Sequence, residues 1–127
     1  MGALGGFHHV KLPVSDVATS RDWYVRVLGL EVDIEFVDDG VLRGVALVDP
    51  DRTLSIALRH DPARAAALAG FDALALGVPT RDGVAAWRAR LDELGVPHGG
   101  LITGHHGGSV LVGLRDPDGV ELRLYAD

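Results

Sequence analysis

The sequence contains two related halves, and this internal repeat limits the folds that the chain can adopt. Residues 7–14 and the Trp23 that follows them match residues 71–78 and Trp87. Halves of about 60 residues would each be marginally stable alone, so the two copies should belong to one domain. The repeat therefore predicts a pair of similar modules rather than one larger irregular fold.

Each half shows the same order of elements: one strand, one helix and three further strands. Strands are predicted where apolar and polar residues alternate, and helices where apolar residues recur at helical spacing between a capping residue and a glycine. In the first half we expect a strand at 7–14, a helix from Ser15 or Asp16 to Gly29, and strands at 31–37, 41–48 and 54–58. In the second half we expect a strand at 71–78, a helix from Thr80 to Gly95, and strands at 101–103, 109–115 and 120–125.

The predicted fold class is α+β, with two βαβββ modules whose curved mixed sheets enclose a cleft. We expect one domain over 1–127, with module one at 6–60, a linker at 61–70 and module two at 71–127. Within the linker, residues 63–69 are rich in alanine and form either a short helix or an irregular connection.

Composition excludes several classes of function. The chain has no cysteine, which rules out disulfides, thiolate catalysis and cysteine-bound metals, and is compatible with a reducing compartment. A formal charge of −6 without a clustered basic patch argues against nucleic acid as a partner. No apolar run is long enough to cross a membrane, so we expect a cytoplasmic protein that binds neither nucleic acid nor membrane.

In each module, the helix should cover one face of the sheet and leave the other face to a ligand. Alternation assigns a set of side chains to this open face, and His8 to the opposite one. The candidate ligand-binding residues are His9, Lys11, Arg43, Ala57, Ala73, Arg123 and Tyr125, and the candidate catalytic residues are Glu121 and Arg123.

Three segments together resemble the vicinal oxygen chelate superfamily, over nearly the whole chain. They are FHHVKLPVSD at 7–16, SRDWYVRVLGLEV at 20–32 and DPDGVELRLY at 116–125, where Asp116-Pro117-Asp118-Gly119 predicts a type I turn. The superfamily includes glyoxalase I, bleomycin resistance proteins, fosfomycin-modifying enzymes and extradiol dioxygenases. The resemblance implies the paired βαβββ fold and is much less specific for the reaction.

Members that bind a divalent metal use four ligand positions, two in each module. The resemblance places them at His9, Ala57, Ala73 and Arg123 in this chain. Alanine has no donor atom, and a permanently protonated guanidinium repels a cation. We therefore expect no metal and no cofactor at the usual site.

The sequence allows more than one role for several of the candidate residues. Arg123 either binds an anionic ligand or pairs with Glu121, and Glu121 is either a general base or that partner. His9 is a candidate for ligand contact or proton relay. His105 and His106, in a glycine-rich segment that we expect to be a mobile hairpin loop or a lid, are candidates for an alternative metal site with His9 and Glu121.

The leading function is a metal-free protein that binds a small organic molecule, anionic or aromatic, as bleomycin resistance proteins do. The alternative is a glyoxalase-like lyase, an isomerase or a hydrolase in which Glu121 or His9 moves a proton and Arg123 stabilises an oxyanion. A second alternative is a metal-dependent enzyme with unusual ligands. Because related small proteins often pair, we also expect a homodimer.

Overall fold

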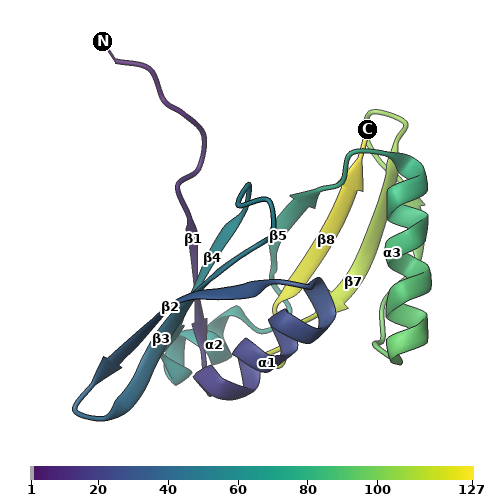
Figure 1. Cartoon of the computed structure of the whole chain (residues 1–127). Helices are drawn as coiled ribbons and strands as arrows, with labels where there is room; N and C mark the ends of the chain where they lie inside the picture. Colours follow the sequence, from purple (N-terminus) through teal and green to yellow (C-terminus); the bar gives the residue numbers. More distant parts are fainter. Residues whose placement is uncertain (1) are drawn as a thin grey trace. The chain divides into compact units, whose positions relative to one another are not determined.

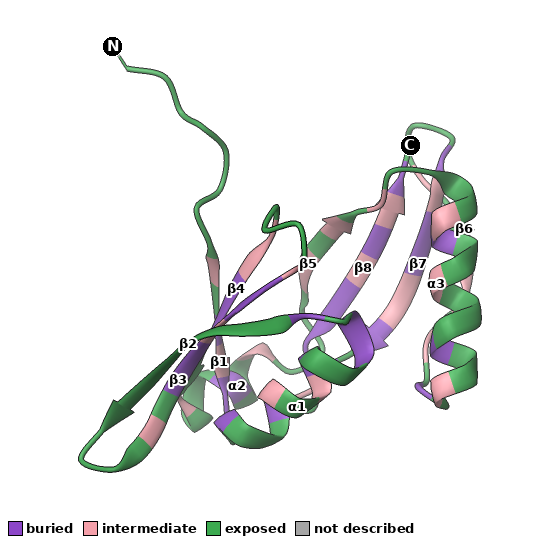
Figure 2. Ribbon diagram, viewed as in Figure 1, coloured by how far each residue is buried: buried purple, intermediate pink, exposed green. Residues whose placement is uncertain are grey.

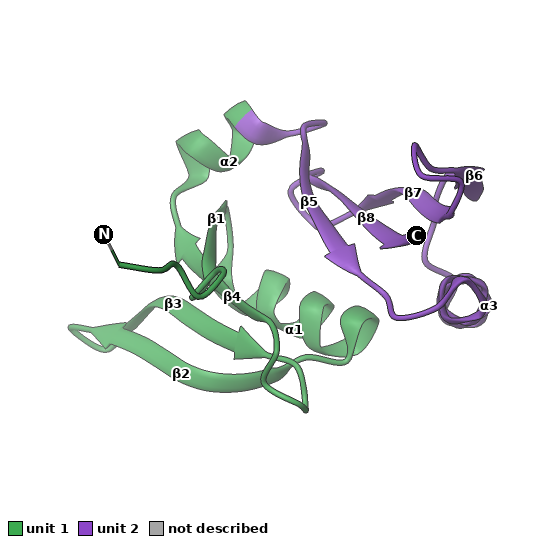
Figure 3. Ribbon diagram, turned by 90° about the horizontal axis from the view of Figure 1, so that it is seen from above, with its two compact units in different colours: residues 1–67 green, residues 68–127 purple. Residues whose placement is uncertain are grey.

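The computed structural model describes residues 2–127 and divides the chain into two units, each with its own four-stranded mixed sheet. Figure 3 shows the division, which falls between Ala67 and Leu68, inside the segment predicted as the linker. Each unit contains the predicted order of one strand, one helix and three strands, so the α+β prediction of two βαβββ modules is confirmed.

The sheet of the first unit has the strand order β1-β4-β3-β2 (Figure 1). Its strands are β1 (Val10–Val14), β2 (Glu31–Asp38), β3 (Val41–Val48) and β4 (Ser55–His60). β1 runs parallel to β4, and the other neighbours are antiparallel. This topology puts β1 and β2, which are consecutive in the sequence, at opposite edges of the sheet.

One helix, α1 (Val17–Leu28), packs against β3 and β4. Of the two predicted capping residues, Asp16 is the one used: its carboxylate accepts a hydrogen bond from the backbone N–H of Thr19 at 2.9 Å. Gly29 ends the helix in the left-handed conformation, with φ of 71°. The residues that α1 buries lie at helical spacing and are Val17, Ser20, Tyr24, Val27 and Leu28.

β1 is shorter than the strand predicted at 7–14. Its pairing with β4 begins only at Val10, opposite Ile56, and Phe7 is 93% exposed. Residues 7–9 alternate as a strand would, but they have no neighbouring strand to bond. Their side chains are therefore not held to the two faces of the sheet.

The β2–β3 hairpin closes on Asp39 and Gly40, both with positive φ, as a type I′ turn requires. Two irregularities follow along the hairpin: Asp33 is an extra residue in β2, and Arg43 is an extra residue in β3. Between these bulges, Phe36 pairs with Gly44. Figure 2 shows β2 exposed along its length. Its exposed residues include four apolar ones, Val32, Ile34, Phe36 and Val37.

Residues 62–68 form helix α2 (Pro62–Leu68), so the alanine-rich segment is a short helix. Asp61 begins it: its carboxylate accepts hydrogen bonds from the backbone and the side chain of Arg64. Ala65 is the residue that α2 buries.

The second unit repeats the first in its sheet order, β5-β8-β7-β6. Its elements are β5 (Asp72–Gly77), α3 (Arg81–Leu94), β6 (Leu101–Thr103), β7 (Ser109–Arg115) and β8 (Glu121–Ala126). Thr80 caps α3 through a hydrogen bond from the N–H of Gly83, and Gly95 ends it with φ of 70°. Four apolar residues recur at helical spacing along this helix: Val84 and Leu91 are buried, and Trp87 and Leu94 are half-buried.

The core of the second unit forms between α3 and the faces of β7 and β8 that it covers. Leu122 and Leu124 on β8 are buried there, and Arg123 between them is half-buried on the other face. Figure 2 shows β8 as a strand of buried and half-buried residues. β8 follows the predicted reversal at Asp116, whose carboxylate accepts hydrogen bonds from the N–H groups of Asp118 and Val120. In residues 2–127, no helix has the length and apolar character needed to cross a bilayer.

Replacing Gly44 by Ala should lower the free energy of unfolding. A Cβ atom at position 44 would lie 2.7 Å from the backbone oxygen of Leu58, so a strand would have to move. Adding a methyl group at such a site costs roughly 1–3 kcal/mol. The control is Gly77→Ala, where a Cβ atom meets nothing within 4 Å and φ is not positive. The control should be neutral or stabilising by up to about 1 kcal/mol in urea unfolding, and equal losses in the two variants would contradict the packing argument.

Candidate functional site

A pocket of about 320 Å³ lies on the face of the first sheet that α1 leaves uncovered. Its floor comes from Ala46 and Ala57, which pair with each other across β3 and β4. They alternate with Val45, Leu47 and other residues buried toward α1. This volume is at the lower end of the range for small-molecule sites. We call it the unit 1 pocket.

Small residues create the depth of the unit 1 pocket, and β2 supplies an apolar wall. Ile34 and Phe36 line the pocket from β2. Gly44 is on β3, the strand between β2 and β4. It has the ring of Phe36 on one side and the aliphatic stem of Arg59 on the other. The wall is therefore suited to a planar apolar group.

Two cations line the unit 1 pocket, Lys11 on β1 and Arg59 on β4. Lys11 pairs in register with the floor residue Ala57, and Arg59 lies two residues further along β4 on the same face. Within the part of the chain that the structure describes, neither cation forms an ion pair. Both charges are available to a ligand.

His8 and His9 both line the unit 1 pocket, with their Nδ1 atoms 2.7 Å apart. The prediction that His8 faces away from the open side was wrong. The reason is that β1 begins at Val10, so the alternation of the strand does not extend to these two residues. The pocket therefore has two imidazoles at its edge.

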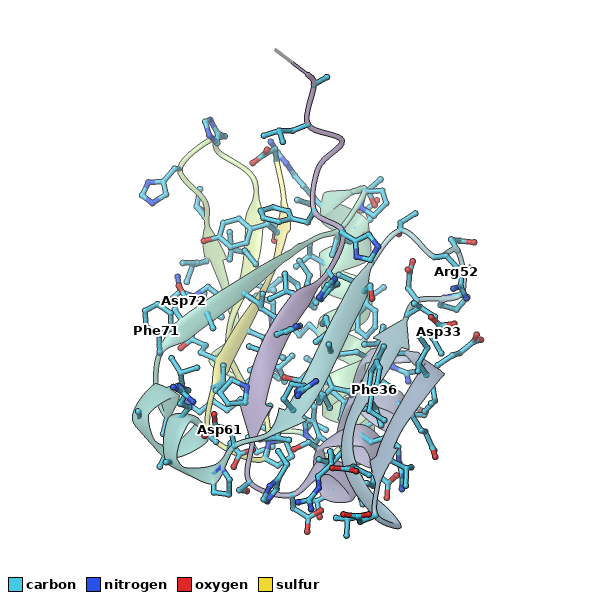
Figure 4. All side chains as sticks on the ribbon, turned by 90° about the vertical axis from the view of Figure 1, so that its left-hand side faces the viewer. Asp33, Phe36, Arg52, Asp61, Phe71 and Asp72 are labelled. Atoms are coloured by element: carbon cyan, nitrogen blue, oxygen red, sulfur yellow. The ribbon has the colours of Figure 1, made fainter. Side chains whose placement is uncertain are left out.

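One carboxylate also lines the unit 1 pocket, that of Asp33, the extra residue of the β2 bulge. Arg52, in the connection between β3 and β4, forms an ion pair with it, with 3.1 Å between Nη2 and Oδ1. Figure 4 shows Asp33 and Arg52 side by side, with Phe36 further along β2. The negative charge on the pocket wall is thus paired.

In the second unit, the predicted catalytic residues form an ion cluster on the face opposite Leu122 and Leu124. The Nε atom of Arg123 lies 2.6 Å from Oε2 of Glu121 and 3.2 Å from Oδ2 of Asp72. The pairing of Arg123 with Glu121, one of the two alternatives open from the sequence, is therefore present. Tyr125 is half-buried two residues further along the same face of β8.

Asp72 joins this cluster because of a bulge that the sequence pattern does not reveal. Asp72 pairs with Glu121 and Leu74 pairs with Leu122, so Ala73 is the extra residue of β5. Simple alternation places Ala73 on the open face, whereas the bulge brings the carboxylate of Asp72 to Arg123. Ala73 itself is half-buried.

The cluster makes Glu121 a weak base. The hydrogen bond from Arg123 lowers the pKa of Glu121 from its ordinary value of 4.5, and the backbone N–H of Gly113 acts in the same direction, while burial opposes both. The same hydrogen bond raises the pKa of the Arg123 guanidinium. At neutral pH, Glu121 is ionised and Arg123 is protonated, which is the state of a stable ion pair.

The remaining candidates are exposed at a bulge or in a turn. Arg43 is exposed at its bulge and is absent from the pocket lining. His105 and His106 are exposed in the turn between β6 and β7, which the hydrogen bond from Gly104 N–H to Gly108 O closes.

The four positions that the resemblance implies do not supply a donor set for a divalent metal. Of the four positions implied by the resemblance, only His9 carries a ligand atom, and the two carboxylates nearest Arg123 are held by its guanidinium. Over residues 2–127, no three His, Asp or Glu side chains gather closely enough to share an ion.

Comparison with known proteins gives a consistent assignment. The family model described as the Glyoxalase/Bleomycin resistance protein/Dioxygenase superfamily matches residues 6–124. No curated protein sequence matches the chain.

Solved structures share the fold over nearly the full length. TnmS3, an antibiotic binding protein from Streptomyces sp. CB03234, is 25% identical with a TM-score of 0.75, and the match covers 97% of this chain and 98% of that one. A lactoylglutathione lyase from Agrobacterium tumefaciens is 17% identical with a TM-score of 0.76, covering 97% and 94%. The fosfomycin resistance protein FosX from Listeria monocytogenes is 16% identical with a TM-score of 0.73, covering 98% and 95%.

Replacing Arg123 by Met should raise the pKa of Glu121, because the hydrogen bond and the nearby charge are lost while burial remains. The difference in free energy of unfolding between the wild type and this variant should be largest above about pH 4.5. It should shrink as the pH falls through the depressed pKa, since protonated Glu121 no longer pairs with Arg123. Carbon-13 NMR titration of the carboxyl group and urea unfolding across the acid range measure the two effects.

Arg115→Met is the matched control for this prediction. Arg115 pairs in register with Glu121 and lowers its pKa only through the weakest of the contributions. Its replacement should therefore move the Glu121 pKa less than that of Arg123 does. A larger shift in the Arg115 variant would mean that general charge, and not the hydrogen bond, controls Glu121.

Proposed function

Because this chain belongs to the Glyoxalase/Bleomycin resistance protein/Dioxygenase superfamily, we propose that it binds a small organic molecule in the unit 1 pocket, without a metal ion. The observation that carries the proposal is the lining of that pocket. A floor of alanines leaves volume, and Ile34 and Phe36 supply apolar surface. Lys11 and Arg59 supply positive charge that no acidic side chain in residues 2–127 pairs with. Apolar surface with a few polar groups is typical of small-molecule sites.

The likeness to an antibiotic binding protein supports a binding role. That structure is 25% identical to this chain and matches it over nearly the full length of both. Capture of a molecule needs affinity alone, and the pocket lining is chemically sufficient for it. His9 and Ala57 would contact the ligand beside Lys11, and Arg123 and Tyr125 remain candidates on the second unit.

The enzymatic alternative has less support from the geometry. A general base works best when its pKa is near the operating pH, whereas the pKa of Glu121 is lowered by Arg123. The Nε atom of Arg123 is occupied by two carboxylates, which reduces its value as an oxyanion donor. His9 is the remaining candidate for proton transfer, with His8 as its hydrogen-bond partner.

We also propose that the protein acts as a cytoplasmic homodimer. Support for association comes from β2, an edge strand whose Val32 and Val37 are exposed and do not belong to the lining of the unit 1 pocket. Exposed apolar side chains on an unpaired edge are typical of surfaces that a partner covers. The absence of cysteine fits a reducing compartment.

Replacing Ala46 by Trp should abolish binding of N-phenylnaphthylamine, a neutral aromatic dye whose fluorescence rises in apolar surroundings. The indole would occupy the floor of the unit 1 pocket, where Ala46 is half-buried. Dye titration by fluorescence measures the dissociation constant, and circular dichroism confirms that the variant is folded. Phe36→Ala provides a milder second variant, expected to weaken dye binding by about tenfold through lost apolar contact.

Ala85→Trp is the control, since Ala85 is exposed on α3 in the other unit. It adds the same side chain and should bind the dye as the wild type does. Equal binding by the wild type and by folded Ala46→Trp and Phe36→Ala variants would place the dye elsewhere and refute the proposal.

A further inference from the structure

The charges around the unit 1 pocket differ in whether they are compensated. Lys11 and Arg59 line the pocket without an ion-pair partner in residues 2–127. Asp33 lines it as an anion, and its carboxylate is paired with Arg52, which is outside the lining. The two cations would attract an anionic ligand. The carboxylate of Asp33 would repel the same ligand if it were not paired with Arg52.

Two local irregularities of the backbone bring Asp33 and Arg52 together. Asp33 is at the pocket wall because it is the extra residue of the β2 bulge. Arg52 has φ of 57°, a conformation that costs a residue with a side chain roughly 1 kcal/mol. Among residues 2–127, the only other non-glycine residue with positive φ is Asp39, which lies in the hairpin turn where positive φ is required.

Asp49 holds Arg52 in this conformation. Its backbone oxygen accepts from the N–H of Arg52 at 2.9 Å. Its carboxylate accepts from the hydroxyl of Thr53 and from the N–H of Leu54, both at 2.7 Å. The connection between β3 and β4 is thus braced in the form that directs the Arg52 guanidinium to Asp33, although the side chain of Arg52 is 63% exposed.

Resting on the function proposed above, we propose that the unit 1 pocket selects a planar organic anion, and that Arg52 sets this selectivity from outside the pocket by neutralising Asp33. Lys11 and Arg59 receive the anionic group, and the ring of Phe36 contacts the planar part. Arg52 is a positioning residue in this scheme and does not touch the ligand.

A pair of related dyes tests the ligand class. Anilinonaphthalene sulfonate carries one negative charge, and N-phenylnaphthylamine is the same aromatic framework without the sulfonate. At neutral pH, the wild type should bind the sulfonate at least about tenfold more tightly, the value of a charge-assisted hydrogen bond. Lys11→Met and Arg59→Met should each remove most of that preference and change the affinity for the neutral dye by less than about twofold.

Arg88→Met is the control for loss of one positive charge. Arg88 is exposed on α3, in the other unit, and forms no ion pair in residues 2–127. This variant should keep the wild-type preference for the sulfonate. If it loses the preference as the pocket variants do, net charge rather than Lys11 and Arg59 determines the binding, and the proposal is wrong.

A double-mutant cycle tests the role of Arg52. In the protein that keeps Asp33, Arg52→Gln should weaken sulfonate binding by about threefold, because Asp33 is then unpaired. In the Asp33→Asn background, Arg52→Gln should leave the affinity for the sulfonate unchanged. Arg52→Lys, which keeps the charge, should bind the sulfonate as the wild type does.

The outcomes separate this inference from the function on which it rests. If neither dye binds, or if dye binding is unchanged when Ala46→Trp and Phe36→Ala alter the pocket, the proposed function fails. If the neutral dye binds in the pocket and the sulfonate is no tighter, the pocket is not selective for anions and the inference fails alone. If Arg52→Gln weakens sulfonate binding equally in both backgrounds, Arg52 contacts the ligand directly and its positioning role is overturned.

Discussion

Each sheet of this protein has one helix, packed on one face, and that one-sided burial determines where chemistry can occur. Alternate residues of a strand point to opposite faces, so a strand that buries its leucines and valines under a helix presents its other residues on the open side. Leu122 and Leu124 are buried under α3 in this way, which leaves Arg123 on the open face of its sheet. Ala57, between Ile56 and Leu58 on β4, follows the same rule in the first unit.

The two open faces have different electrostatic character, although the units repeat one another in topology. In the second unit, one guanidinium is surrounded by two carboxylates, and each group stabilises the charged state of its partner. In the first unit, two cations have no such partner among residues 2–127, whereas the one carboxylate of the wall is paired with Arg52. The first face can therefore accept an anion, while the second already satisfies its own charges.

Much of the fold was predictable because the relevant signals are local. Capping residues, closing glycines and helical spacing identified both long helices, and the Asp39-Gly40 pair is a local signal for the hairpin turn. The site was less predictable, because successive side chains of a strand point to opposite faces of the sheet. One extra residue therefore reverses the face to which the side chains beyond it point. Alternation alone pointed to Ala73 where Asp72 is found, and it misplaced His8 because the pairing of β1 stops at Val10. Arg52 carries no sequence signal, since its partner Asp33 is 19 residues away and belongs to a bulge.

The bulge at Ala73 has a consequence for how a sheet of this kind can diversify. A single extra residue there moves an acid, rather than a methyl group, next to the guanidinium of the neighbouring strand. An extra residue inserted without a bulge would turn the preceding residues of the strand to the other face, whereas the bulge absorbs Ala73 and keeps Asp72 opposite Glu121. Length changes inside strands, as well as replacements at fixed positions, therefore offer this architecture a route to new chemistry.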